Sequence, residues 1–278
     1  MFKLRDWIDE SQLSDYLSSN PRAIAYLEAH PDLIDWRTLS DNPEAYSLLN
    51  KNQDKIEWRW LSINPSSIKI LETNPKKINW NMLSRNPNAI HLLQNNLNKI
   101  NWKWLSSNPS AIQLLEENPD ELVWKNLSSN PAAIHLLKQY PEKIYWPDFS
   151  INPAAVPILE TNLDKIEWNC LSINPNALHL LTQNLDKIDW FLLSMNPGAI
   201  PLIEKNLDKI NWTLLSENPA AIHILEQYPD KIYWPNFCKN PAIFEYDYPH
   251  MTRPFTEELM ANRFQPNNMD KFEAWGYE

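Results

Sequence analysis

Tryptophan recurs at a fixed step of 22 residues along most of this chain, and no insertion breaks the step. It occupies ten such positions, from Trp36 to Trp234. The dipeptide Asn-Pro keeps the same step eleven times, from Asn20-Pro21 to Asn240-Pro241. Strict periodicity of this length is typical of a solenoid, whose stacked units bury their apolar faces against their neighbours. The register therefore predicts one elongated domain of about ten units over residues 17–241, with residues 1–16 as an N-terminal cap and 242–278 as a C-terminal cap and tail.

The first half of each unit predicts a helix. Asn-Pro suits a helix start, because Asn caps free amides and Pro is tolerated at the first helical position. Apolar residues then follow with the spacing of a helix that is buried on one side. With only two glycines in the chain, we expect Asn to supply the left-handed residue that closes the helix, as at Asn74. Pro157 and Pro201 fall inside this stripe and should shorten the helix locally.

The second half of the unit leaves two interpretations open. Ile100, Trp102 and Leu105 suit a short helix or a 3₁₀ turn, whereas Ile and Trp two residues apart also suit the strand of a leucine-rich repeat. Pro147 and Pro235 directly follow a ladder tryptophan, so no long helix runs through that point. We expect an all-α solenoid of short α and 3₁₀ helices with helical caps, and keep a leucine-rich-repeat-like β/α solenoid as the alternative. Layers about 8–10 Å apart would give a rod or arc about 90 Å long.

Composition argues against several kinds of function. A net charge of −10 disfavours a generic phosphate binder, and two glycines provide no phosphate-binding loop. Cys170 and Cys238 do not form a metal-spaced set. We therefore expect no enzyme, cofactor or metal site. No apolar run approaches a membrane span of about 20 residues, and the N-terminus lacks the apolar stretch of a signal peptide. An intracellular, membrane-free protein is the expectation.

The repeat has a specific resemblance. Units reading LSxNPxAIxLLExNxDKIxW, then NPAIFEYDY and a last helix with Phe255, Leu259, Met260 and Phe264, resemble uncharacterised tandem-repeat proteins of large DNA viruses of algae and protists. The resemblance covers residues 17–264. It implies a viral origin and a place in the host cytoplasm or the virion, and it implies no activity. More loosely, Asn-Pro followed by a short apolar helix resembles leucine-rich variant repeats, which are solenoids of α and 3₁₀ helices.

Three recurring features could be mistaken for catalytic or ligand sites. The histidines spaced by 44 residues should lie about 20 Å apart, too far to share a metal ion, so we expect surface positions or a periodic contact surface. The repeated Asp-Lys pair suits a helix start followed by a solvated lysine. Trp60 and Trp104 are additional to the ladder and could stack on single-stranded nucleic acid, although stacking without a basic groove binds weakly. The histidines are His91, His135, His179 and His223.

The residue between Ser and Asn in each unit varies and gives the best candidate contact surface. Ile151 and Ile173, with Met195 next, should form an apolar docking patch, with the histidines, Trp60 and Trp104 as further candidates. The sequence thus favours a non-catalytic scaffold that binds a host or viral protein along the solenoid surface. A structural virion component, such as a minor capsid protein or spacer, is the first alternative, and a nucleic-acid-binding repeat protein is the second.

Overall fold

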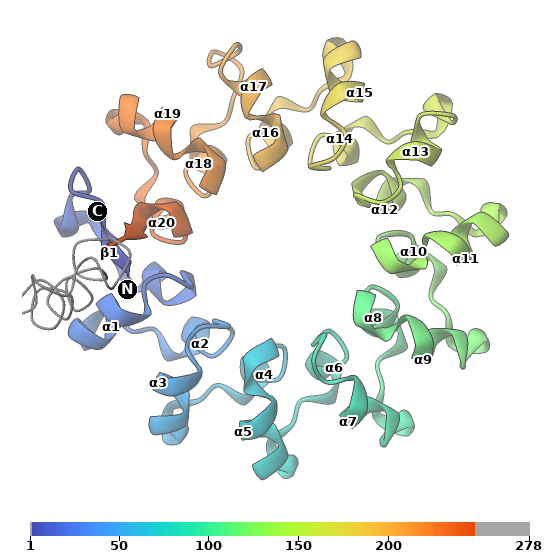
Figure 1. Ribbon diagram of the computed structural model, residues 1–278, viewed down its shortest axis with the longest axis horizontal. Coiled ribbons are helices and arrows are strands. Elements are labelled where there is room, and N and C mark those ends of the chain that lie inside the picture. Colours follow the sequence, from blue (N-terminus) through green and yellow to red (C-terminus); the bar gives the residue numbers. More distant parts are fainter. Residues whose placement is uncertain (1, 248–278) are drawn as a thin grey trace, which may run out of the picture.

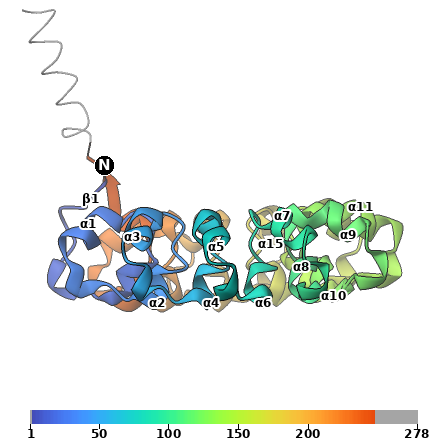
Figure 2. The ribbon, with the colours of Figure 1, turned by 90° about the horizontal axis from the view of Figure 1, so that it is seen from below.

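The chain forms a closed ring of short helices. A computed structural model describes residues 2–247, and the C-terminal elements expected around Phe255 to Phe264 and beyond lie outside the described residues. One set of helices follows the inside of the ring and a second set follows the outside (Figure 1). Seen from the edge, the ring is a flat disc (Figure 2). The last unit returns to the first, so the expected open rod or arc is wrong.

The outer and inner helices alternate along the described residues, with ten of each, and the inner position of the first unit is a 3₁₀ helix, Asp15–Ser19. The outer helices are α1 (Ile24–Ala29), α3 (Tyr46–Lys51), α5 (Ile68–Thr73), α7 (Ile90–Gln94), α9 (Ile112–Glu116), α11 (Ile134–Gln139), α13 (Val156–Leu159), α15 (Leu178–Gln183), α17 (Ile200–Ile203) and α19 (Ile222–Gln227). The inner helices are α2 (Trp36–Leu39), α4 (Trp58–Leu61), α6 (Trp80–Leu83), α8 (Trp102–Ser106), α10 (Trp124–Ser128), α12 (Trp146–Ile151), α14 (Trp168–Leu171), α16 (Trp190–Leu193), α18 (Trp212–Leu215) and α20 (Trp234–Phe237).

Most of these helices are joined by single 3₁₀ turns, such as Pro65–Ser67 before α5 and Pro75–Lys77 after it. The alternation of short α and 3₁₀ helices confirms the predicted all-α solenoid. Within residues 2–247 the strands are β1 (Phe2–Leu4) and β2 (Phe244–Tyr246), so the repeat is not of the leucine-rich β/α type. The core between the two helix layers consists mainly of leucine and alanine, and Leu49, Leu71 and Leu93 are fully buried in successive units.

Buried asparagines bond each unit to the one before it. The side-chain Oδ1 of Asn64 caps the following turn by accepting a hydrogen bond from the Ser66 backbone amide at 2.9 Å, as expected for Asn-Pro. Its side-chain Nδ2 also donates to the backbone carbonyls of Ser40 at 3.0 Å and Asn42 at 2.9 Å. This second role was not expected. Because Asn64 is fully buried and uses donors and acceptor together, a substitution at this position disrupts two layers.

A serine ladder runs beside the asparagine ladder. The Ser62 hydroxyl donates to the Trp58 carbonyl at 2.7 Å and accepts a hydrogen bond from the Asn79 amide of the next unit at 2.9 Å. The same two-sided arrangement recurs at the equivalent serines, for example at Ser150, whose hydroxyl accepts from the Glu167 amide. These buried hydroxyls are fully hydrogen-bonded to backbone groups, so the Leu-Ser motif is explained by the stacking of one unit on the next.

The asparagine ladder continues across the junction between the two ends of the chain, here called the seam. Asn20 donates to the carbonyls of Cys238 and Asn240, both at 2.9 Å, and accepts from the Arg22 amide. Its three bonds thus match those of a typical unit, although the two carbonyls that accept from it are more than 200 residues away in sequence. The first unit therefore stacks on the eleventh in the same manner as any unit stacks on its neighbour.

Three departures from the repeat occur at the seam. Ser14 stands where the ladder has tryptophan and Cys238 stands where it has serine, and their Oγ and Sγ atoms lie 3.8 Å apart. Burial raises the pKa of the Cys238 thiol. Trp7 packs beside Phe237, with ring centroids 5.8 Å apart, and so provides the aromatic ring that Ser14 lacks. Its buried Nε1 has no hydrogen-bond partner.

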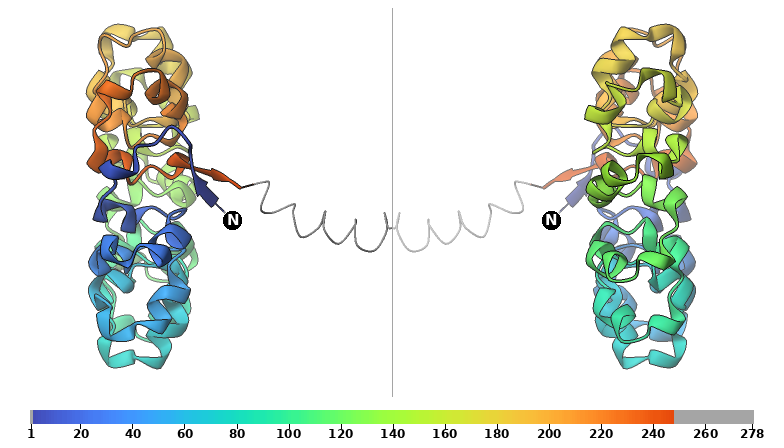
Figure 3. Two further views of the ribbon diagram at one scale, coloured as in Figure 1. Left: turned by 90° about the vertical axis from the view of Figure 1, so that its left-hand side faces the viewer. Right: turned by 90° about the vertical axis from the view of Figure 1, so that its right-hand side faces the viewer.

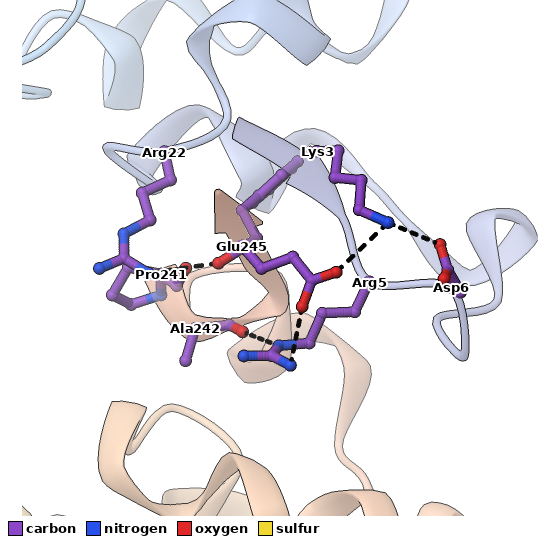
Figure 4. A network of polar contacts seen from close by, with 8 residues as sticks. Lys3, Arg5, Asp6, Arg22, Pro241, Ala242 and Glu245 are labelled. Carbon is purple, nitrogen blue, oxygen red and sulfur yellow. Dashed lines mark hydrogen bonds and ion pairs between the residues drawn. The ribbon is translucent and has the colours of Figure 1, made fainter. Parts of the chain in front are cut away.

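The chain ends fasten the seam from outside the repeat. Strands β1 and β2 pair antiparallel, with Lys3 opposite Glu245, and they project from one face of the ring (Figure 3). Glu245 binds Lys3 at 3.3 Å and Arg5 at 3.1 Å, and Arg5 Nε donates to the Ala242 carbonyl at 2.7 Å (Figure 4). Arg22 Nη1 donates to the Phe244 carbonyl at 3.2 Å. We call this set of contacts the clasp.

Two expectations about the outer helices have different outcomes. Helices α13 and α17, which contain Pro157 and Pro201, have four residues each, against five or six in the other outer helices, so the predicted shortening is confirmed. The left-handed closing asparagine is wrong. Asn74 has φ −129° and ψ 54°, and it closes α5 through its side chain, whose Nδ2 donates to the Ile70 carbonyl at 2.9 Å.

Candidate functional site

The inner helices direct three positions of each unit away from the core. In α4, Leu61 is fully buried and Trp58 half-buried, whereas Arg59 is exposed. The 100° turn per residue of an α-helix places Arg59, Trp60 and Ile63 on the side opposite Leu61. The outer helices cover the Leu61 side, so the other side faces the centre of the ring (Figure 1). We call residues one, two and five places after the ladder tryptophan, or after Ser14 in the first unit, the inner wall.

The size of the central opening follows from helix geometry. Neighbouring inner helices pack against each other, as α8 does on α10 and α10 on α12. Eleven layers at about 8–10 Å each place the helix axes on a circle about 30 Å across. Removing one helix diameter of about 10–12 Å leaves an opening on the order of 20 Å. The exposed Phe191 and Arg59 show that solvent reaches this wall.

Positive charge gathers on the inner wall from α2 to α10, and we call this stretch the basic arc. The Arg37 and Arg59 guanidinium carbons lie 5.5 and 5.8 Å from the Trp60 ring centroid. Trp104 has the same arrangement with two other cations, at 4.7 and 5.5 Å. Each tryptophan therefore lies within cation–π distance of two cations. The cations of the basic arc are Arg37, Arg59, Arg85, Lys103 and Lys125.

Apolar side chains predominate on the facing part of the inner wall, from α12 to α18, which we call the apolar arc. Its wall positions also include two half-buried carboxylates, Asp148 and Glu217. Phe191 is 54% exposed, Met195 42% and Ile151 36%, and Ile173 and Leu192 are half-buried. The structure thus brings the predicted Ile151, Ile173 and Met195 onto one continuous surface in successive units. Exposed apolar surface of this kind is uncommon unless something covers it. In Figure 1 the helices of the two arcs lie on opposite sides of the opening.

A hollow follows the inner wall where the two arcs meet at the seam. One pocket of about 530 Å³ is lined by Tyr16, Thr38, Glu217 and Lys239 among others. An adjoining pocket of about 340 Å³ shares Thr38 with it and reaches Asp41 and Trp60. Desolvation raises the pKa of Asp41 to about 6, although the residue remains exposed, and the charge of Arg85 partly opposes this shift. Asp41 is the one carboxylate at a wall position of the basic arc.

The ladder tryptophans do not belong to this site. They are half-buried and pack against the core. Lysines of the repeated Asp-Lys pair lie over the tryptophan of the preceding unit, as with Lys165 Nζ at 4.9 Å from the Trp146 ring. Lys99, which follows Asn98 at the same position of its unit, has its Nζ 4.4 Å from the Trp80 ring. The lysine is therefore a stacking partner between layers as well as a solvated neighbour.

The repeated histidines lie on the outer helices, away from the inner wall. His135 Nε2 is 2.6 Å from Glu116 Oε1, and His179 Nε2 is 2.6 Å from Glu160 Oε1. His91 and His223 make the equivalent contacts with Glu72 and Glu204. Each histidine thus joins two neighbouring units, and about half of its side chain is exposed. The candidate residues therefore separate into an inner group and an outer group.

Sequence reasoning placed Arg85 at the variable position between Ser and Asn, but it missed the residues that directly follow a ladder tryptophan: Arg37, Arg59, Lys103, Lys125 and Phe191. The sequence does mark the position directly after the ladder tryptophan, because the residue there varies strongly from unit to unit while its neighbours repeat. Between residues 2 and 247, no three His, Cys, Asp or Glu side chains converge as a potential metal site. In the same part of the chain, no helix is long and apolar enough to cross a lipid bilayer.

Comparison with known proteins gives no match, so the function is inferred from the geometry of the structure. No protein-family model, curated protein or solved structure matches the chain.

Proposed function

We propose that this protein is a non-catalytic ring that binds a protein partner on its inner wall. The observation that carries the proposal is the division of that wall into a basic arc and a facing apolar arc. The framework residues Asn, Ser and Leu repeat from unit to unit, whereas the wall positions change (Arg59, Lys103, Pro147, Phe191). Selection for stacking explains the framework, and a bound partner explains an ordered change in chemistry around the wall.

The exposure of the apolar arc favours a protein as the partner. Phe191 and Met195 would be more stable in contact with another apolar surface, at roughly 25 cal/mol per Å² covered. Aromatic residues, Met and Arg are also enriched at protein interfaces. The wall combines all three types, with Trp60 and Arg59 on one side of the opening and Met195 on the other.

Affinity capture of the tagged full-length chain tests this proposal. Lysate from cells that produce the protein naturally is treated with nuclease, and capture is compared at low and high salt. We expect a defined protein to be retained by the native ring and lost from Ile151→Asp/Ile173→Asp. The matched control is His135→Ala/His179→Ala on the outer helices, which should retain the partner. Retention by a folded inner-wall variant would refute binding at this wall.

Single-stranded nucleic acid is a second candidate, favoured by the basic arc. The weak point of a stacking site was the lack of a basic groove, and Arg37, Arg59, Arg85 and Lys103 now surround Trp60 and Trp104. Aromatic stacking beside cations is the usual arrangement for strands bound without sequence preference. Fluorescence anisotropy with labelled oligo-dT tests it, because binding through phosphates should weaken steeply with salt.

The viral setting is proposed from the resemblance of the repeat alone. A host-directed adaptor would be free in the cytoplasm of the infected cell, whereas a minor capsid protein or spacer would be part of the particle. Quantitative mass spectrometry of purified particles separates the two, since only a structural component keeps a fixed ratio to the capsid protein.

A further inference from the structure

We propose that the segment held in the ring is an acidic amphipathic α-helix, with its carboxylates toward the basic arc and its apolar side toward the apolar arc. This inference rests on the proposed function and names the chemistry of the partner. Two facing surfaces of different character require a partner whose opposite sides also differ. An amphipathic helix provides this in the smallest element, because its charged and apolar residues occupy opposite faces.

The charge of the basic arc runs against the charge of the whole protein. The chain carries a net charge of −10, yet the wall positions from α2 to α10 hold five cations and the single carboxylate of Asp41. A generally acidic surface repels an acidic partner, so attraction is confined to this arc. The arc thus favours an acidic segment specifically inside the ring.

The arginines of the basic arc are arranged for carboxylate binding. The Arg59 guanidinium carbon lies 5.8 Å from the Trp60 ring centroid, and that of Arg85 lies 4.7 Å from the Trp104 centroid. A cation–π contact at this distance restrains the arginine side chain near the wall. A guanidinium can then bind a carboxylate through two parallel N–H groups. None of Arg37, Arg59 and Arg85 is within 4 Å of an acidic oxygen of the described residues.

The dimensions suit a helix. An opening on the order of 20 Å admits one α-helix of about 10–12 Å, and long arginine and methionine side chains of the wall can span the remaining gap. Ile151, Ile173, Phe191 and Met195 then meet the apolar stripe of the helix. The bases of a nucleic-acid strand can stack on an aromatic ring such as Phe191, but a strand has no aliphatic side to cover Ile151, Ile173 and Met195.

Labelled synthetic peptides test the inference directly. Three fluorescein-labelled 21-residue peptides are compared with the full-length ring by anisotropy at low and moderate salt. The first segregates Glu and Leu on opposite helix faces, the second has the same composition in scrambled order, and the third replaces each Glu with Lys. We expect the segregated acidic peptide to bind at least tenfold more tightly than either control. Its affinity should fall as salt rises, because charges contribute.

Paired variants assign the contacts. Arg59→Glu/Lys103→Glu reverses two exposed charges of the basic arc, and Ile151→Asp/Ile173→Asp places charge in the apolar arc. Each pair should weaken binding of the segregated acidic peptide at least tenfold. The control His135→Ala/His179→Ala should leave it unchanged. Circular dichroism and urea midpoints establish that each variant is folded.

Several outcomes would overturn the inference. Equal binding of the scrambled peptide would show that charge alone is recognised, and stronger binding of the Lys peptide or of oligo-dT would exclude an acidic helix. Loss of peptide binding in the histidine control would place the site on the outer helices. If inner-wall variants lose the captured cellular partner but no acidic peptide binds, the inference fails and the proposed function stands. If they keep that partner, the proposed function fails.

Discussion

If the ring is closed, Asn20 at the seam should contribute as much to stability as an equivalent asparagine in the interior of the repeat. In the interior of the repeat, Asn130 donates to the carbonyls of Ser106 and Asn108 at 3.0 and 3.1 Å and accepts from the Ala132 amide at 2.9 Å. Each such bond contributes about 1 kcal/mol net. Asn130→Ala should therefore lower the free energy of unfolding by about 3 kcal/mol.

Asn20 makes the same three bonds across the seam, at 2.9, 2.9 and 3.0 Å. In a closed ring, Asn20→Ala should therefore cost about as much as Asn130→Ala. In an open solenoid the amide hydrogens of Asn20 would face water, and only the bond to the Arg22 amide would be lost. The cost of losing one helix-capping bond is about 1 kcal/mol.

Urea denaturation followed by circular dichroism measures both variants. A solenoid can also open locally, so amide hydrogen exchange is read alongside it. The Arg5 amide, which donates to the Ile243 carbonyl at 3.0 Å, reports on the seam. A cost of about 1 kcal/mol or less for Asn20→Ala, with an unchanged Arg5 exchange rate, would refute closure.

Three further predictions concern charge and aromatic contacts. The pKa of Asp41 is raised to about 6, so the folded state binds the proton more tightly than the unfolded state. As pH rises from about 4 to 6, the unfolding free energy of the native chain should therefore fall relative to that of Asp41→Asn. Urea titrations at several pH values measure this difference. A difference that stays constant with pH would contradict the prediction. Lys99→Met should lower the free energy of unfolding by about 0.5–1 kcal/mol, because it removes the cation above the Trp80 ring. A double-mutant cycle with Trp80→Leu should give a coupling energy of the same size. Zero coupling would show that the lysine–tryptophan contact does not contribute to stability. Trp7→Phe keeps an aromatic ring beside Phe237 and removes an unpaired buried N–H. Thermal melting should therefore show equal or higher stability. A loss above about 2 kcal/mol would indicate that the Trp7 N–H does have a hydrogen-bond partner.

The units themselves were predictable because their signals are local. Asn-Pro fixes a capped start, Pro147 is accommodated in the first turn of α12, and Pro157 shortens α13 through its backbone geometry. Closure was not predictable, because it depends on a small rotation per unit accumulated over eleven units. A slightly different rotation would leave the same sequence pattern in an open spiral. The substitutions at Ser14 and Cys238 mark the seam in the sequence, but their meaning depends on which units meet.

The candidate site was predictable in part. Ile151, Ile173 and Met195 were singled out because apolar residues at a variable position need an explanation, and Trp60 and Trp104 because they are additional to the ladder. Apart from Arg85, which lies at that variable position, the cations of the basic arc were not, since single Arg and Lys residues on short helices resemble ordinary surface charges. Only the ring brings residues from five separate units onto one wall.

The seam has a consequence for assembly in crowded solution. Its two surfaces are complementary to each other, so an opened copy presents both halves of a head-to-tail contact to every other opened copy. Two chains could exchange ends and close as a ring of double length, or a series of chains could continue as a filament. The curvature of the solenoid brings the two ends of one chain together, and the clasp adds contacts between them, so closure is an intramolecular step that does not depend on protein concentration. Self-closure therefore prevails at ordinary protein levels, and mutations that weaken Arg5 or Glu245 should make the assembly state depend on concentration.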